Sequence, residues 1–231
     1  MVTTGEIDNI LIELREIFFN YGERPVLKGL SFCFYKGERV GLVGPNGSGK
    51  TTLFLIIMGL LKPKSGELKI FGQIRKKEKD FTDVRRRIGF VFQDPDDQLF
   101  SPTVAEDIAF GPLNLGVPRE QVMKIVSNTL AMLGLSGFEN RVTHKLSGGE
   151  KRLVSLATVL AMNPDVLLLD EPTSGLDEKT TLRLIDILKN LNTSYIIASH
   201  DKEFLKEVTN KQYRMIEGKL DILDIQDSLK I

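Results

Sequence analysis

A glycine-rich segment between an apolar run and a helical stretch constrains the fold of this chain most strongly. The apolar run Val40–Val43 stops at residues 44–51, which read Gly-Pro-Asn-Gly-Ser-Gly-Lys-Thr and fit the pattern G-x-x-x-x-G-K-[ST]. Glycines let backbone N–H groups turn inward around an anion, and the start of the following helix adds a favourable dipole. The pattern therefore predicts a strand, a phosphate-binding loop and a helix in that order.

The residues of this loop have distinct expected roles toward a nucleotide. Lys50 is expected to reach the β- and γ-phosphates, and the Thr51 hydroxyl is expected to bind Mg²⁺. The sequence has no N-K-x-D motif, which would read guanine, and this favours an adenine nucleotide. The expected nucleotide-binding residues of this segment are Gly44, Pro45, Asn46, Gly47, Ser48, Gly49, Lys50, Thr51 and Thr52.

A second apolar run, Val166–Leu169, ends in the acidic pair Asp170 and Glu171. An uninterrupted apolar run is typical of a strand that is buried on both faces of a parallel sheet. Asp170 is expected to hold Mg²⁺ through its coordination sphere, and Glu171 to orient or deprotonate an attacking water. An acidic pair at a strand end could instead simply solvate a turn, but the loop at residues 44–51 favours the catalytic interpretation.

Composition and charge narrow the class of protein. The chain has 231 residues, enough for one domain with a sizeable core, and its 31 Lys+Arg balance its 31 Asp+Glu. A neutral chain argues against nucleic acid as the main partner. No apolar run approaches the ~18 residues that span a bilayer, and the polar stretch Met1–Asn9 resembles neither a secretory signal nor a transit peptide. With Cys33 as its only cysteine, we expect a cytosolic chain that does not cross the membrane by itself.

Hydrophobic periodicity divides the chain into three parts. The first third alternates as strands do, residues 101–163 have helical spacing, and the last third returns to strands with helices between them. This predicts an α/β fold, with a catalytic core over residues 1–98 and 164–231 and a helical subdomain over residues 99–163. The expected strands are 10–19, 30–35, 40–43, 66–74, 88–92, 166–169 and 195–198, and the expected helices include 55–61, 122–133 and 182–191.

The segment Leu146-Ser147-Gly148-Gly149-Glu150 predicts a capping box at the start of a helix. The Ser147 side chain is expected to cap the helix, Glu150 to reach back to it, and the two glycines to leave backbone N–H groups uncovered. Such a helix start is a second anion site, nearly a hundred residues after the first. Two phosphate sites on different subdomains suggest a two-fold dimer in which each chain offers one site to the nucleotide of the other.

Together these motifs resemble the nucleotide-binding subunit of an ABC transporter over nearly the whole chain, with residues 146–150 matching the family signature. The resemblance implies a P-loop NTPase core of mixed sheet, parallel with N-terminal antiparallel strands. It implies that Gln93 touches Mg²⁺ and senses the membrane partner, and that Asp177 crosses the dimer interface. His200 is implied to contact the γ-phosphate, and Tyr21 to stack on adenine.

Some of these residues also have a purely structural interpretation. Tyr21 could be an edge-strand aromatic residue and His200 a satisfied core histidine, although His200 follows an apolar strand at the sheet edge where ligands bind. His144 is expected to be a solvated loop residue. The basic runs 75–79 and 85–87 are expected to form a solvated face and not to bind nucleic acid, since no aromatic residue interleaves them as a stacking platform would.

Residues 92–100, Phe-Gln-Asp-Pro-Asp-Asp-Gln-Leu-Phe, resemble the Q-loop of the energy-coupling-factor and cobalt/nickel uptake (CbiO-like) ATPases, which carries a second glutamine, here Gln98. Residues 103–112 and 159–162 resemble the same group. This implies uptake of a vitamin or transition metal ion, with a transmembrane coupling subunit and a membrane substrate-binding component, at the cytoplasmic face of the cell membrane. The alternatives are another class of ABC transporter and a soluble ABC ATPase.

The resemblance also implies a mechanism with ATP and Mg²⁺ as its cofactors. Two ATP molecules lie between the 44–51 loop of one subunit and the signature of the other, so that ATP favours the closed dimer. The second subunit is an identical chain or a paralogue, and a groove beside residues 93–100 receives a helix of the membrane subunit. The implied catalytic residues are Lys50, Gln93, Glu171, Asp177 and His200, and the implied metal-binding residues are Thr51, Gln93 and Asp170.

Overall fold

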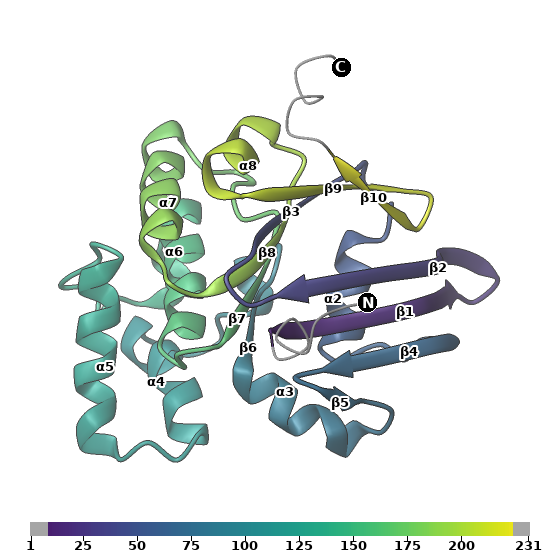
Figure 1. The fold of residues 1–231 in the computed structure, drawn as a ribbon. Helices are drawn as coiled ribbons and strands as arrows, with labels where there is room; N and C mark the ends of the chain where they lie inside the picture. The colour runs from purple at the N-terminus through teal and green to yellow at the C-terminus, as the bar shows by residue number, and fades with distance from the viewer. Residues whose placement is uncertain (1–8, 224–231) are drawn as a thin grey trace.

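The computed structural model describes residues 9–223 of the chain. The single domain expected over residues 1–231 therefore begins and ends outside the described residues, as does nearly all of the N-terminal stretch discussed above. A six-stranded sheet runs through the middle of the molecule in the order β10-β9-β3-β8-β7-β6 (Figure 1). Its strands are β3 (Arg39–Val43), β6 (Ile88–Val91), β7 (Val166–Asp170), β8 (Ser194–Ala198), β9 (Lys211–Ile216) and β10 (Lys219–Leu223).

The neighbouring strands of this sheet pair in parallel, except for the antiparallel pair β9 and β10. Strands β7 and β8 are buried along their whole length, as their apolar runs predict. Asp170 pairs with Ala198, and Leu42 of β3 also pairs with Ala198. The chain therefore leaves β3, β7 and β8 at one edge of the sheet, which is where ligands bind in open α/β sheets.

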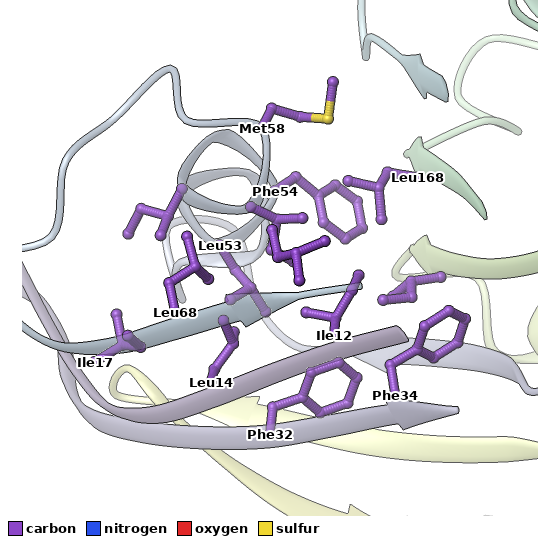
Figure 2. Close-up of a cluster of buried hydrophobic side chains, with 14 of the residues drawn as sticks. Ile12, Leu14, Ile17, Phe32, Phe34, Leu53, Phe54, Met58, Leu68 and Leu168 are labelled. Atoms are coloured by element: carbon purple, nitrogen blue, oxygen red, sulfur yellow. The ribbon is translucent and has the colours of Figure 1, made fainter. Parts of the chain in front are cut away.

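Four further strands form a separate antiparallel sheet in the order β2-β1-β4-β5. They are β1 (Ile10–Tyr21), β2 (Arg24–Tyr35), β4 (Ser65–Ile70) and β5 (Gln73–Ile74). Figure 2 shows apolar side chains of this sheet, including Ile12 and Phe34, packed beneath the helix α2 (Lys50–Ile57). Phe54 of α2 and Leu168 of β7 belong to the same buried cluster. This shared core fixes the position of the α2 start relative to both sheets.

The expected fold class is confirmed: a parallel core, N-terminal antiparallel strands and helices. One expected strand is wrong in its extent, because residues 66–74 form two strands and not one. The break falls at Phe71 and Gly72, whose φ angles are 50° and 75°. Two successive residues in the left-handed region turn the chain back on itself, so that β5 pairs with β4.

The helix after the loop, which was expected to continue over residues 55–61, ends earlier, because α2 spans Lys50–Ile57. The chain turns at Gly59, which has a φ of 69°. A Cβ atom at this position would lie 2.3 Å from the ring of Phe81. The close packing of Phe81 thus requires glycine there and ends the helix before Pro63.

The helices within residues 104–190 lie on the side of the parallel sheet away from the antiparallel sheet (Figure 1). Three of them fall within residues 99–163 and pack on one another around a second apolar cluster. We therefore propose that residues 99–163 form the helical subdomain and that the residues on either side form the catalytic core. The helices besides α2 are α3 (Phe81–Arg87), α4 (Val104–Asn114), α5 (Arg119–Met132), α6 (Gly148–Leu160), α7 (Glu178–Asn190) and α8 (Lys202–Val208), with short 3-10 turns η1 (Glu78–Asp80), η2 (Pro95–Asp97) and η3 (Thr143–Lys145).

The expectation of a solvated basic face over residues 75–79 and 85–87 is wrong for one residue. Arg75 is buried, and its guanidinium donates to the carbonyls of Ile70 and Asp80 and to the carboxylate of Asp83. Arg75 therefore ties the β4–β5 hairpin to η1 and α3. His144 is exposed, as expected.

Candidate nucleotide and metal site

The loop between β3 and α2 has the strand–loop–helix context that its sequence predicts. Gly49 precedes the first residue of α2 and has a φ of 112°, a conformation that L side chains rarely adopt. At Gly44 the constraint is space, because a Cβ atom would lie 2.4 Å from the carbonyl oxygen of Met215. Glycine at these two positions lets the loop close tightly over the N-terminus of α2.

The side chain of Lys50 is buried inside this loop. Its Nζ donates hydrogen bonds to the carbonyl oxygens of Gly44, at 2.7 Å, and Pro45, at 3.3 Å. The same ammonium lies 3.7 Å from Oε1 of Glu171. The cation is thus already held at the centre of the loop, facing the carboxylate at the end of β7.

Asp170 and Thr51 meet at the base of the loop. The hydroxyl of Thr51 donates to Oδ2 of Asp170 at 2.6 Å. The other carboxylate oxygen of Asp170, Oδ1, is buried and has no hydrogen-bond partner within the described residues. Burial raises the pKa of Asp170, with the bond from Thr51 acting in the opposite direction. A hydroxyl and an unsatisfied buried carboxylate oxygen are hard donors, which suit Mg²⁺.

Glu171 and His200 lie next to each other at the same sheet edge. Nδ1 of His200 is 2.8 Å from Oε2 of Glu171, and the backbone N–H of His200 donates to that oxygen at 3.3 Å. Glu171 has a φ of 45°, which turns the chain sharply at the end of β7. The His200 side chain is 68% exposed, so the interpretation of it as a core histidine is wrong.

A cavity of about 350 Å³ brings most of the predicted loop residues together with Tyr21. Tyr21 is half exposed at the end of β1, with its ring edge-on to Phe19 at 4.9 Å between centroids. Two residues that the sequence reasoning missed, Arg24 and Val26, also line this cavity; the only available signal was their place just after Tyr21 on the β1–β2 hairpin. The lining residues are Tyr21, Arg24, Val26, Asn46, Gly47, Gly49, Lys50, Thr51, Thr52, Gln93, Asp170 and Glu171.

Gln93 also lines a second cavity of about 590 Å³, which it shares with Thr51, Asp170 and Arg152. Arg152 is a buried residue of α6 that the sequence reasoning missed. Its guanidinium donates to the carbonyl of Phe92 at 2.9 Å and reaches that of Ser174 at 3.4 Å, while burial lowers its pKa. Arg152 therefore connects α6 to the backbone at Phe92 and at Ser174, on the two sides of the candidate metal site.

The signature residues lie at the start of α6 and do not line the cavity with the 44–51 loop. The predicted capping box is present: the backbone N–H of Glu150 donates to Ser147 Oγ at 3.3 Å, and that of Ser147 to Glu150 Oε2 at 2.8 Å. The bond from Ser147 lowers the pKa of Glu150. A Cβ atom at Gly148 would meet no atom within 4 Å. The helix start therefore opens outward from this chain.

Asp177 likewise does not reach this chain's own nucleotide cavity. Its Oδ1 accepts a hydrogen bond of 2.8 Å from the backbone N–H of Thr180, which caps α7 and lowers the pKa of Asp177. A Cβ atom at Gly149 would lie 3.3 Å from the side chain of Thr180, so the starts of α6 and α7 are close to each other. Asp177 and the signature thus lie together, away from the 44–51 loop.

A third cavity, an apolar groove of about 310 Å³, lies between the strands and the helices. Phe100 is 68% exposed and Phe110 is 51% exposed, and their rings meet edge-on at its rim. Gln98 forms part of the wall: it accepts a hydrogen bond from the backbone N–H of Phe92 and donates to Ser155 O and Thr158 Oγ1. The backbone of Phe92 is therefore held by Gln98 from the groove and by Arg152 from the other cavity.

Across residues 9–223, no helix is both long enough and apolar enough to cross a lipid bilayer. Nor do the described residues contain a cluster of three or more His, Cys, Asp or Glu that could cage a metal. A metal bound by Thr51 and Asp170 would have to complete its shell with other oxygens, which is the usual situation of Mg²⁺ with a nucleotide phosphate.

Comparison with known proteins identifies the family. Residues 27–174 match the ABC transporter family. The chain is 46% identical over 215 residues to the energy-coupling factor transporter ATP-binding protein EcfA of Methanocaldococcus jannaschii, covering 91% of this chain and 77% of that protein.

Solved structures agree with this match. CbiO1 from Clostridium perfringens, part of the ABC transporter complex CbiONQ, has a TM-score of 0.85 and 35% identity, covering 96% of this chain and 90% of that one. A dimeric post-hydrolysis ATP-binding cassette bound to ADP and Pi has a TM-score of 0.82 and 29% identity, covering 91% and 97%. The chain therefore belongs to the ABC transporter family, as an ATP-hydrolysing member.

Proposed function

We propose that this ATPase drives an energy-coupling-factor type uptake transporter from the cytoplasmic face of the cell membrane. The single observation that supports this class most strongly is the 46% identity to an EcfA protein over 91% of the chain. The likeness to CbiO1, which is part of a CbiONQ complex, points in the same direction. Gln98, the second glutamine expected for this group, also makes three hydrogen bonds in the wall of the apolar groove.

ATP binds in the cavity between Tyr21 and the 44–51 loop. The exposed ring of Tyr21 stacks on adenine, and the loop N–H groups surround the phosphates. Lys50 leaves the carbonyls of Gly44 and Pro45, to which it now donates, and donates to the β- and γ-phosphates instead. The phosphates thus replace two loop carbonyls as acceptors for a buried ammonium, which makes their binding favourable.

Thr51, Asp170 and Gln93 would hold Mg²⁺ in the nucleotide site. Thr51 and Asp170 fit this ion because they supply a hydroxyl and a buried, unsatisfied carboxylate oxygen at one point. Gln93 would add an amide oxygen, since it lines the second cavity together with both of them. When bound, the ion neutralises negative charge that develops on the phosphate oxygens.

Glu171 orients and deprotonates the attacking water, and His200 contacts the γ-phosphate. One oxygen of Glu171 is held by His200, while the other is buried without a hydrogen-bond partner among the described residues. This second oxygen lies 3.7 Å from Lys50 Nζ in the lining of the nucleotide cavity and is the acceptor that a water would use. His200 thus fixes the rotamer of the base while its exposed ring remains able to reach the phosphate.

Two chains complete each site, head to tail. Ser147, Gly148, Gly149 and Glu150 lie outside this chain's own cavity with an open helix start, and a helix N-terminus favours an anion. A second ABC ATPase subunit, identical or paralogous, supplies the 44–51 loop opposite this start, and its Asp177 approaches the water. The dimeric state of the related cassette bound to ADP and Pi supports this arrangement.

The apolar groove receives a helix of the transmembrane coupling subunit. Two exposed phenylalanines at a groove rim, Phe100 and Phe110, are the kind of surface that an amphipathic helix covers. A membrane substrate-binding component then carries the cargo, which is a vitamin or a transition metal ion such as cobalt or nickel. No nucleic acid takes part.

Affinity purification of this chain from detergent-solubilised membranes of its own source, followed by mass spectrometry of its companions, tests the proposed class. We expect a multi-helix coupling subunit together with a small membrane protein that binds the cargo. Recovery with a soluble binding protein in place of that membrane protein would assign another importer class. Recovery of the chain without any membrane protein would favour a soluble ABC ATPase.

A further inference from the structure

A cavity of about 620 Å³ lies outside both the nucleotide site and the apolar groove. Its walls come from the connection between α2 and β4, residues 59–64, from β4 itself, and from the segment 75–78. Phe81, which is buried against the turn at Gly59, closes its apolar side. Neither the motifs of the chain nor the proposed function uses this cavity.

The walls of this cavity carry an excess of positive charge. Seven charged residues line it, five of them basic. Arg75 already pairs with Asp83, and Glu78 already pairs with Arg85 outside the cavity. Four lysines therefore face one remaining carboxylate, that of Glu67, and none of the four forms an ion pair within residues 9–223. These four residues, which we name the cavity lysines, are Lys62, Lys64, Lys76 and Lys77.

The framework that carries two of the cavity lysines is already fixed. Oδ2 of Asp80 accepts hydrogen bonds from the backbone N–H groups of Lys76, at 3.0 Å, and Lys77, at 2.9 Å. The buried guanidinium of Arg75 locks the same segment to Ile70 O at 3.0 Å and to Asp80 O at 2.7 Å. A ligand would therefore have to order only the lysine side chains and not the backbone, which lowers the entropic cost of binding.

The cavity lies directly beside the apolar groove. Gly59 and Leu61 line the cavity, while Met58 and Leu60 line the groove. Arg85 lines the groove and pairs with Glu78 of the cavity wall. Figure 1 shows β5, α3 and the lower end of α4 at one end of the molecule, opposite the end that carries β10. The two hollows thus belong to the same end of the fold.

We propose that this cavity binds the phosphate group of an anionic membrane lipid. The inference rests on the proposed function, which turns the apolar groove, and hence the neighbouring cavity, toward the membrane. Lysines act as flexible point charges that suit a phosphate, and basic residues near a membrane surface are attracted to its anionic lipids. The cavity thereby anchors the ATPase at the membrane beside its protein partner.

Vesicle co-sedimentation of the purified chain tests the proposal. The probes are vesicles of phosphatidylcholine alone and vesicles of equal parts phosphatidylcholine and phosphatidylglycerol, with saturating ADP present so that lipid phosphates cannot enter the nucleotide cavity. We expect binding to the anionic vesicles only, weakening as salt is added.

Two variants with equal changes in charge make the test specific. In the first, the cavity lysines are replaced by glutamine, and we expect its partition onto anionic vesicles to fall ~10-fold or more while its basal ATPase activity is unchanged. The second removes four lysines from elsewhere on the surface and should bind like the unaltered chain. The positions of this control variant are Lys36, Lys202, Lys206 and Lys219.

Three outcomes overturn the proposal. Equal losses in both variants would mean that only overall charge matters, and unchanged binding in the first variant would exclude the cavity. Binding of inorganic phosphate by the unaltered chain, seen by calorimetry and lost in the first variant, without any vesicle binding, would assign the site to a free anion. Because the vesicles contain no protein, the result does not depend on whether the chain co-purifies with a coupling subunit.

Discussion

Nδ1 of His200 lies 2.8 Å from Oε2 of Glu171, although the two residues follow different strands of the parallel sheet. The pairing of Asp170 with Ala198 sets this contact, because it brings the ends of β7 and β8 into register. The backbone N–H of His200 donates to the same oxygen at 3.3 Å. The Glu171 carboxylate is thus held by two groups of one residue, while its second oxygen, 3.7 Å from Lys50 Nζ, has no hydrogen-bond partner among the described residues.

Glu171→Gln should retain ATP binding and lose turnover. The amide keeps the size of the side chain but cannot take a proton, so we expect kcat to fall by ~10²-fold or more and the ATP-bound dimer to accumulate. Steady-state ATPase assays and size-exclusion chromatography with ATP measure both effects. Unchanged turnover would remove Glu171 from the role of base.

His200→Ala should also lower kcat by ~10²-fold or more, because the variant no longer orients Glu171 or contacts the γ-phosphate. The chain offers a matched control, since His144 is its other histidine and is exposed. His144→Ala is expected to keep full activity. Equal activity of the two variants would show that the contact between His200 and Glu171 has no catalytic part.

Lys50→Ala should lose nucleotide affinity. The ammonium now donates to two loop carbonyls and lies 3.7 Å from Glu171, so the alanine variant lacks the cation that the phosphates would meet. We expect the Kd for ATP to rise by ~10-fold or more, because the variant loses a charge-assisted hydrogen bond to the phosphates. Calorimetric titration with ATP measures this, and tight binding by the variant would contradict the assignment of the loop.

The sequence predicted the core of the fold well because local pattern and tertiary structure agree there. The apolar runs before Gly44 and before Asp170 are parallel strands, as uninterrupted burial requires. The errors came from contacts between distant segments. The end of α2 depends on Phe81 packing over Gly59, and the division of residues 66–74 depends on a turn at Phe71 that no alternation reveals.

Site residues were predictable where a motif fixes their spacing, and were missed where only the fold brings them in. The pair Thr51 and Asp170 was predicted from two motifs and meets at 2.6 Å. Arg152 carries no motif of its own, and its contacts with Phe92 and Ser174 exist only because α6 packs beside β6. Arg24 was missed because only the fold of the β1–β2 hairpin brings it to the cavity of the 44–51 loop, and no motif spacing indicates this.

Tyr195 should make the free energy of unfolding depend on pH in the alkaline range. Its ring is fully buried with its hydroxyl donating to Val208 O, and burial raises its pKa from 10.0 to about 12. Between these values the unfolded chain has lost the proton that the folded chain keeps. The free energy of unfolding therefore falls as pH rises from 10 to about 12, by about 1.4 kcal/mol per pH unit.

Urea unfolding of the Tyr195→Phe variant across this pH range measures the effect. The variant lacks the ionisable group, so its free energy of unfolding should decline less steeply with pH than that of the unaltered chain. Tyr21→Phe is the matched control, because Tyr21 is half exposed, and it should leave the slope unchanged. Equal slopes for the Tyr195→Phe variant and the unaltered chain would contradict the prediction.

Gln98→Ala should uncouple transport from ATP hydrolysis. Gln98 bonds to Phe92 N at 3.1 Å and to Ser155 O and Thr158 Oγ1, each at 2.8 Å, so it links the groove wall to the strand end before Gln93. Removing it leaves the nucleotide cavity intact, since Gln98 does not line it. We therefore expect cargo uptake per ATP hydrolysed to fall by about five-fold or more, while basal ATPase activity changes little.

The measurement uses the transporter reconstituted in liposomes, with uptake and phosphate release followed in parallel. Leu99→Ala, which removes a buried side chain next to Gln98, should have the same effect on coupling. Gln121→Ala is the control, because Gln121 is an exposed glutamine of α5. If uptake and basal hydrolysis fell equally in the Gln98→Ala variant, the residue would serve the catalytic site directly, and the groove would not be the surface through which the membrane subunit acts.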